Sequence, residues 1–284
     1  MRRKKVKLNI NKSGTATILA TSCWHLGNPS VSDEGIHKFI TKAKRHKWIH
    51  HGDVVEGIMR SDRRFSIEEH KDTILDCIHR GAETIKKAKD SCIGLIRGNH
   101  DETPSRDIGD VAEYIARTAG IPYLSSTAFI KMIGTKGSTT GFVAHGNGGS
   151  NPKSGEPERK QLNRQIWLRN LLSQFDADWG GIGHCHRYIV TVPCSEEKLG
   201  FGDAGNVVRA PVLSKPCWYY AAPSMFTTYD LHADVGNYAE MALYGATDIG
   251  WIEMVFNRDG KIGCIREVDS TGKTKQEHYP KIVG

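Results

Sequence analysis

Apolar and polar positions follow two periodicities along this chain, one typical of strands and one typical of helices. Short runs rich in apolar and β-branched residues predict strands at residues 15–22, 47–50, 92–97, 139–144 and 179–183. The segments between them carry apolar residues three or four positions apart, which is the spacing of one helix face. Strands and helices are therefore expected to alternate through the first two thirds of the chain.

Four segments carry the helical spacing, and three of them contain a signal for a helix start. Ser32 is a predicted N-cap, Ser66 and Glu69 form a capping-box pattern, and Pro157 suits a first helical turn. The apolar positions on the four faces are Ile36, Phe39, Ile40 and Ala43; Ile67, Ile74, Ile78, Ala82 and Ile85; Ile108, Val111, Ala112, Ile115 and Ala119; and Leu162, Ile166 and Phe175.

The last third of the chain is rich in strand patterns. Residues 187–192 and 217–222 are apolar runs, and residues 251–268 predict a hairpin that turns around residues 257–260. Strand–helix alternation followed by a β-rich tail predicts a layered α/β domain, with either one large mixed sheet or two packed sheets.

The chain shows no internal repeat and no clear linker, so residues 1–284 are predicted to form a single domain. Residues 1–14 are a basic entry into the first strand. Residues 195–210 combine glycine with mixed charge, which fits either a flap over a site or a surface hairpin.

Net charge, apolar runs and cysteine usage indicate which partners and which compartment this protein has. A formal net charge of +7 on 284 residues favours anionic partners, including nucleic acid. No apolar run approaches the roughly 18 residues of a membrane span, and the basic start lacks the long apolar segment of a secretory signal. Seven cysteines with no CxxC pair indicate reduced thiols. We therefore expect a globular protein of the cytoplasm with no membrane partner.

Metal-capable side chains follow five of the expected strands. Because ligand sites form outside the carboxyl ends of strands in open α/β sheets, these side chains can meet in one cleft. The residues concerned are Cys23 and His25, then Asp53, then Asn99, His100 and Asp101, then His145, and last His184 and His186. Each group alone is a weak signal, but their ordered succession predicts a metal site.

Two of these groups contain pairs spaced two residues apart. In an extended segment alternate side chains share a face, so Cys23 and His25 are expected to point together while Trp24 points away. By the same argument His184 and His186 face the site, and Cys185 faces the packing.

The order of these groups resembles a known family. The segments "CWH", "GDVVE", "GNHD", "HG" and "GHCH" are similar to the motif series of the calcineurin-like metallophosphoesterases. The stretches at residues 145–166 and 175–186 resemble its phage-encoded branch. The resemblance implies a layered sandwich of two mixed β-sheets flanked by α-helices, and for a phage protein the host cytoplasm. Cys23 departs from the pattern, which has aspartate at this position.

Carried over residue by residue, the resemblance implies two divalent transition-metal ions, Mn, Fe or Zn. The first ion would take His25, His186, Asp53 and position 23. The second would share Asp53 and take the remaining ligands, Asn99, His145 and His184. His100 would meet the substrate phosphate or protonate the leaving oxygen, positioned by Asp101.

Cys23 can replace an aspartate ligand without changing the formal charge of the site, because thiolate and carboxylate each carry one negative charge. A thiolate is the softer donor, and it shifts preference from manganese toward zinc or iron. The alternative is a bystander thiol, which would leave the first ion with fewer protein ligands. Cys23 is also the feature that keeps open a non-catalytic binding module with an impaired first metal site.

Arginines that follow two of the motifs are candidate substrate ligands, because guanidinium groups match phosphate geometry. They are Arg60, Arg63, Arg64 and Arg106. A solvated run of charge is the alternative.

The function that these features favour is hydrolysis of phosphoester bonds by attack of a metal-bound hydroxide. The expected substrates are phosphodiesters of nucleotides or nucleic acid. A nuclease proper is a further alternative, although the chain carries no obvious additional DNA-binding domain.

Overall fold

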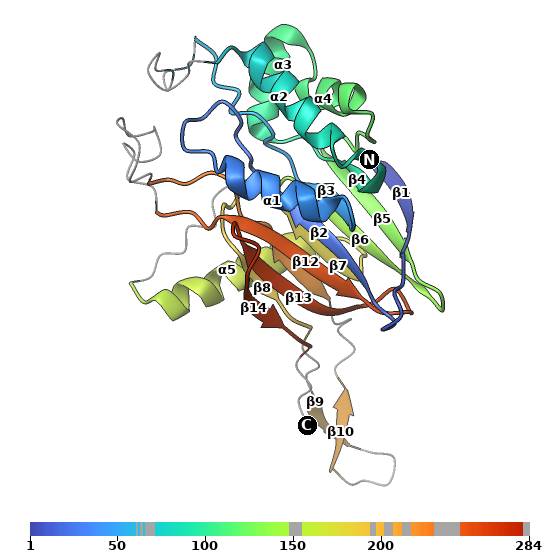
Figure 1. Ribbon diagram of the computed structural model, residues 1–284. Helices are drawn as coiled ribbons and strands as arrows, with labels where there is room; N and C mark the ends of the chain where they lie inside the picture. The colour runs from blue at the N-terminus through green and yellow to red at the C-terminus, as the bar shows by residue number, and fades with distance from the viewer. Residues whose placement is uncertain are drawn as a thin grey trace.

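Two six-stranded mixed sheets form the body of the protein in a computed structural model (Figure 1). The model describes residues 1–60, 62, 65, 72–147, 155–193, 197–201, 207–211, 217–229 and 245–280. The two-sheet form of the predicted α/β sandwich is confirmed.

The first sheet has the order β1-β5-β6-β7-β11-β8. Its strands are β1 (Arg2–Lys7), β5 (Thr127–Ile133), β6 (Ser138–Ala144), β7 (Trp179–Ile182), β11 (Trp218–Ala221) and β8 (Ile189–Thr191). The central strands β6, β7 and β11 are parallel, so their carboxyl ends lie at one edge.

The second sheet has the order β14-β13-β12-β2-β3-β4. Its strands are β14 (Thr274–His278), β13 (Ile262–Asp269), β12 (Gly250–Phe256), β2 (Ala16–Thr21), β3 (Lys47–His50) and β4 (Cys92–Leu95). Strands β2, β3 and β4 are parallel. The antiparallel pair of β12 and β13 confirms the hairpin predicted in the tail.

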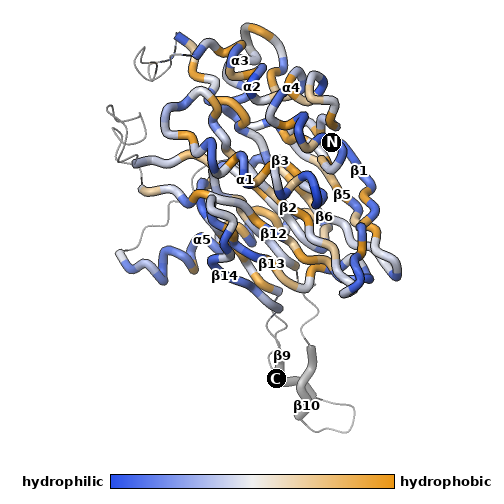
Figure 2. The backbone as a smooth tube through the Cα atoms, viewed as in Figure 1, coloured by the Kyte–Doolittle hydropathy of each residue, from blue (hydrophilic) through white to orange (hydrophobic). Residues whose placement is uncertain are grey.

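The inner faces of the sheets share one apolar core. Ile18 and Met254 from the second sheet pack in the same cluster as Ile130, Trp179 and Tyr220 from the first. Figure 2 shows apolar stretches along the central strands, whereas α5 (Pro157–Leu172) and β14 are largely hydrophilic.

Helices cover both outer faces. Three of them, α1 (Asp33–Ala43), α2 (Ile74–Lys86) and α4 (Val111–Ala119), bury their apolar sides in a second cluster against the second sheet. Helix α5 packs against the first sheet through Leu168 and Leu172. Ser32 caps α1, as predicted, by accepting a hydrogen bond from the backbone N–H of Gly35.

Three helix predictions need correction. Helix α2 begins at Ile74 rather than at Ser66, because Thr73 and Asp76 form the capping box; Ser66 and Glu69 lie outside the described residues. An additional helix, α3 (Asn99–Ile108), precedes α4, so the predicted Ile108 position belongs to a different helix and is 47% exposed.

The predicted apolar face of α5 is also wrong. Leu162 is 54% exposed and Ile166 is 49% exposed, whereas Leu168 and Leu172 are buried. Phe175 lies beyond the helix end and stacks on Phe142. The sequence of α5 carries little amphipathic signal, so tertiary packing decides which face is buried.

Strands β9 (Glu197–Phe201) and β10 (Val207–Pro211) form a separate antiparallel pair. Residues 195, 196 and 202–206 lie outside the described part, and the flap suggested for 195–210 stays a prediction. Along the helices that the structure describes, none is long and apolar enough to cross a bilayer.

Close packing of β6 on β7 sets the spacing of the two strand ends that lead to His145 and His184. Gly141 pairs with Trp179 across this contact, and a Cβ at Gly141 would lie 2.1 Å from the indole ring. We expect Gly141→Ala to lower the free energy of unfolding by roughly 1–3 kcal/mol through overpacking.

Urea unfolding measures the effect of Gly141→Ala. Gly263→Ala is the matched control, because Gly263 also lies in a strand but the nearest atom to its added Cβ would be 3.9 Å away. Equal stability of the two variants would contradict the packing argument.

Candidate metal centre

All seven predicted metal ligands meet where the carboxyl ends of five strands converge. Strands β2, β3 and β4 lead to the loops or helix start that bear Cys23, His25, Asp53 and Asn99, and β6 and β7 lead to His145, His184 and His186. Their ligand atoms form two adjacent groups that share Asp53.

The group expected to hold the second ion centres on His145. Its Nε2 atom lies 3.0 Å from Oδ2 of Asp53, 3.0 Å from Oδ1 of Asn99 and 3.2 Å from Nδ1 of His184. These four residues are the set that the family resemblance implied.

The hydrogen bonding of His145 shows that this group suits a cation. Its Nδ1 lies 2.5 Å from the carbonyl oxygen of His51, a contact that requires a proton on Nδ1. Burial opposes a charge on His145, but attraction to Asp53 raises the pKa of its ring. The neutral form, which a metal would bind, presents a lone pair at Nε2. That lone pair points toward oxygen and nitrogen acceptors of Asp53, Asn99 and His184. Several electron-pair donors therefore lie about 3 Å from Nε2 of His145, and at most one proton can lie between Nε2 and these atoms. Such a group is suited to binding one shared divalent ion.

The group expected to hold the first ion contains two imidazoles and the Cys23 thiol. His25 Nε2 and His186 Nε2 lie 3.1 Å apart, and Sγ of Cys23 lies within 4.8 Å of both imidazoles. Asp53 Oδ2 is 3.9 Å from His25 Nε2. Sγ of Cys23 is also within 4.8 Å of ligand atoms of Asp53 and His145, so the thiol lies between the two groups.

Electrostatics at the centre favour the ligand forms of several residues. Burial opposes the charge on Asp53, but attraction from His145 and His100 holds the pKa of its carboxyl well below the usual range. Burial and neighbouring His145 lower the pKa of His184 to about 4. Burial and His25 lower the pKa of His186 well below its ordinary value. At neutral pH both are therefore neutral imidazoles, the form that binds metals.

Cys23 is fully buried, and Ser22 Oγ lies 3.0 Å from its sulfur. Burial and the Asp53 carboxylate raise the pKa of the thiol well above its ordinary value. A metal deprotonates a coordinating thiol, so binding of a cation at this group would release the Cys23 proton.

The local backbone differs from the extended form that the sequence predicted. Within the described part, six non-glycine residues have positive φ, and five of them are expected ligands: Cys23, His25, Asp53, His184 and His186. Such a conformation costs roughly 1–3 kcal/mol per residue and clusters at functional sites. Cys23 and His25, and likewise His184 and His186, do share a site as predicted. The alternation of an extended strand, from which this was predicted, is not the reason. Trp24 does pack in the core and Cys185 does pack against the first-sheet cluster.

His100 lies beside the two groups and is 9% exposed. Its Nδ1 donates to the backbone carbonyl of Glu56 at 2.6 Å, which leaves Nε2 for other contacts. Its ring meets that of His25 edge to face, with centroids 4.6 Å apart. His25, Glu56 and His100 form a third cluster of possible ligand atoms. Because Nδ1 of His100 is a donor, we interpret this cluster as a hydrogen-bonding group.

Asp101 does not position the His100 ring as expected. Its carboxylate accepts backbone N–H groups from Asp53, Val54 and Gly98 at 2.9–3.0 Å, and so joins the Asp53 loop to the start of α3. Burial and repulsion from Asp53 raise the pKa of Asp101 to about 6. The approach of these segments is close, because a Cβ at Gly98 would lie 2.1 Å from Oδ1 of Asp53.

Glu56 is the site residue to which the sequence reasoning gave no role. It is 2% exposed. Its Oε2 lies 3.0 Å from Nδ1 of His25, although off the direction of a hydrogen bond, and its Oε1 lies 3.5 Å from Nδ1 of His100. Burial opposes the charge on His25, but attraction to Glu56 raises its pKa. The last position of "GDVVE" was the available signal.

Of the four candidate arginines, the structure describes the side chain of Arg60 alone. Arg60 borders a cavity of 560 Å³ that also reaches Glu56. Arg63 and Arg64 lie outside the described residues, and Arg106 belongs to α3. Their role in substrate binding stays a prediction.

Comparison with known proteins yields no matching family model and no matching curated protein. Solved structures are similar at low identity. The phosphoesterase YfcE of E. coli is 11% identical, with 93% of this chain and 100% of that chain covered and a TM-score of 0.43. A predicted phosphoesterase of Streptococcus pneumoniae is 9% identical, with 93% and 98% covered and a TM-score of 0.40.

GAP50, an anchor in the inner membrane complex of Plasmodium, is 10% identical, with 95% of this chain and 90% of that chain covered and a TM-score of 0.42. Likeness at this level carries no argument about activity. None of these three is a phage protein, so the resemblance to a phage-encoded branch stays a prediction.

Proposed function

We propose that this protein is a metal-dependent phosphoesterase that uses two divalent transition-metal ions. The observation that carries the proposal is the pair of donor groups that share Asp53, with lone pairs converging on His145 Nε2. Such paired sites with about 3.5–4 Å between the ions are used for phosphoester chemistry.

Bound ions in these groups would act as Lewis acids toward the phosphate and lower the pKa of water from 15.7 toward about 7. Hydrolysis forms a bond from the water oxygen to phosphorus and breaks the bond from phosphorus to the leaving oxygen. Donation of a proton from Nε2 of His100 to that leaving oxygen requires the imidazolium form of the ring, in which Nδ1 still donates to the Glu56 carbonyl.

Phosphodiesters of nucleotides or nucleic acid are the substrates we propose, in a cytoplasmic setting. The net charge of +7 supports an anionic substrate. A nuclease proper is a narrower form of the same proposal. The competing class is a binding module without catalysis, which Cys23 alone motivates.

A panel assay separates these functions. Purified, folded protein is incubated with bis(p-nitrophenyl) phosphate, p-nitrophenyl phosphate, single-stranded DNA and double-stranded DNA, with Mn, Zn or Fe supplied separately. We expect turnover of at least one substrate, its loss after chelation and its return when metal is restored. No turnover with any metal would refute the enzyme.

Cys23 is proposed as a ligand of the first ion, and its substitution tests this. Cys23→Ser replaces an anionic donor by a neutral hydroxyl, so we expect a loss of affinity of at least roughly 10–100-fold at one of two metal positions, the scale on which even the groups that support metal ligands act. Cys23→Asp restores the negative charge with a harder donor, and should raise manganese-supported turnover relative to zinc.

Metal titration and elemental analysis of each variant measure these effects. Cys92→Ser is the matched control, because Cys92 is also a buried thiol but lies in β4, outside the two donor groups. Unchanged metal content and rate in Cys23→Ser would make Cys23 a bystander.

A further inference from the structure

A cavity of 460 Å³ opens directly beside the second donor group. Asn99 and His145 form part of its wall, and both belong to the set around the proposed second ion. A group attached to a phosphate at that ion would therefore enter this cavity. Its volume lies within the roughly 300–1,000 Å³ of small-molecule sites.

One wall of the cavity is flat and apolar. The ring of Phe175 stacks on Phe142, with centroids 3.6 Å apart and planes 10° apart. Phe142 is only 3% exposed, whereas Phe175 keeps part of its surface accessible and borders the cavity. Leu171 and Ile182 extend the same wall. An aromatic ring with one face covered and its remaining surface toward a cavity is a stacking platform.

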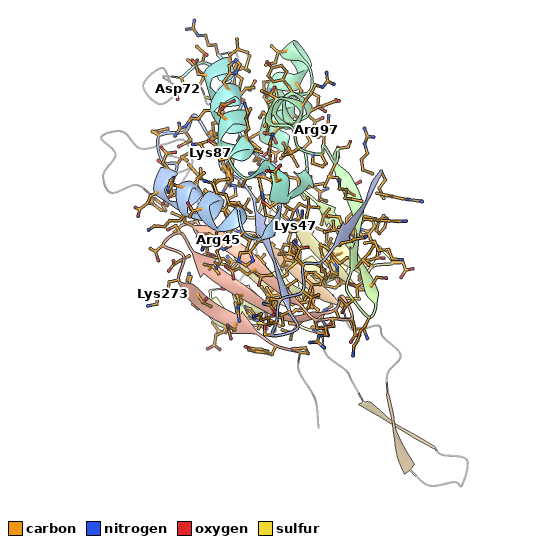
Figure 3. The ribbon with its side chains drawn as sticks, turned by 45° about the vertical axis from the view of Figure 1, so that its right-hand side comes forward. Arg45, Lys47, Asp72, Lys87, Arg97 and Lys273 are labelled. Carbon is orange, nitrogen blue, oxygen red and sulfur yellow. The ribbon has the colours of Figure 1, made fainter. Side chains whose placement is uncertain are left out.

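Other lining residues supply hydrogen-bond donors and acceptors. Arg97, labelled in Figure 3 between β4 and α3, is held by Asp110 at 3.3 Å and by Ser126 at 3.0 Å. Glu102 offers a carboxylate, and Gln174 donates its amide N–H to Leu171 O, which leaves its carbonyl as an acceptor. The cavity thus combines a flat apolar surface with donors and acceptors.

We propose that this cavity binds the base of a nucleotide whose phosphate lies at the second ion. A nucleobase combines a planar aromatic face with an edge of alternating donors and acceptors, which matches the two kinds of lining. An alkyl chain would form no hydrogen bond with Arg97, Glu102 or Gln174, and a bare sugar would not cover Phe175. This inference rests on the proposed phosphoesterase function, and it names the substrate class of that site.

Binding of two ligands that differ only in the base tests the inference. The ligands are the methylenephosphonate analogues of AMP and of ribose 5-phosphate, which cannot be hydrolysed at the phosphorus–carbon bond. Calorimetry with manganese-supplied protein should show that the AMP analogue binds about 5- to 100-fold more tightly, the range that base–aromatic stacking supplies.

Variants at position 175 test whether the ring of Phe175 causes the preference for the AMP analogue. Phe175→Ala and Phe175→Leu should lose it, and Phe175→Tyr should keep it, because leucine preserves apolar packing whereas tyrosine preserves the aromatic face. Phe129→Ala is the matched control: Phe129 also packs on Phe142, with centroids 5.4 Å apart, but does not border the cavity. It should retain the preference.

The outcomes separate this inference from the function on which it rests. Equal affinity for the two analogues in wild-type protein that turns over phosphoesters would overturn the base pocket alone. Tighter binding of hexylphosphonate than of the AMP analogue would also overturn it, in favour of an alkyl occupant. Absence of both phosphonate binding and turnover would overturn the pocket together with the enzyme.

Discussion

Replacing His145 by alanine is expected to lower kcat for every phosphoester substrate by at least about 10²–10³-fold, the scale on which loss of one preorganised electrostatic group acts. The reason is that His145 Nε2 is the point on which Asp53, Asn99 and His184 converge. Its removal would take one of the four donors from the proposed second ion. Steady-state kinetics, together with metal content falling from two ions to about one, measure the effect.

His79→Ala is the control for this substitution, because it removes an imidazole from the exposed side of α2. That variant should keep both its rate and its metal. An active His145→Ala variant with two bound ions would show that the convergence around Nε2 is not a metal site.

Replacing His100 by asparagine is expected to lower kcat by about 10²–10⁴-fold for substrates with an alkyl leaving group, the range for loss of a general acid. A p-nitrophenolate leaving group needs little protonation, so its ester should lose much less. Metal content should not change, because Nδ1 of His100 donates to Glu56 O and the ring belongs to neither donor group.

The comparison of leaving groups decides between the two roles considered for His100. An equal loss for both esters would indicate that the ring binds the phosphate rather than protonating the leaving oxygen. Loss of an ion from His100→Asn would instead make His100 a ligand, through the cluster that it forms with His25 and Glu56.

The convergence of the site could be predicted from sequence because it depends on topology. Parallel strands place their carboxyl ends at a common edge, and the chain carries a metal-capable residue after each of five such strands. The long separation in sequence between Cys23 and His186 does not weaken that argument. The alternation of strands and helices predicted a layered α/β domain with one large mixed sheet or two packed sheets, and the family resemblance implied the two-sheet form with helices outside.

The details that the sequence could not provide depend on local backbone and tertiary packing. The left-handed conformation of Cys23, His25 and Asp53 has no propensity signal, since non-glycine residues rarely adopt it. The buried face of α5 is likewise set by the sheet against which it packs. Glu56 ends the segment "GDVVE", but its position in the motif did not show its role, which is seen only when His25 and His100 lie around it.

Cys23 illustrates how one substitution changes chemistry without changing topology. The thiol occupies the position that the motif gives to a carboxylate, and its sulfur reaches ligand atoms in both donor groups. Compared with an aspartate at position 23, we expect Cys23 to change which metal the site prefers rather than to abolish the site, because a thiolate is a softer donor. Measurements of metal preference therefore distinguish the two.

Elemental analysis of the purified protein tests the central claim most directly. The paired donor groups predict two transition-metal ions per chain, reduced to about one in His145→Ala. Protein that is folded and saturated with metal salts, yet retains one ion or none after removal of the excess, would contradict a dinuclear centre.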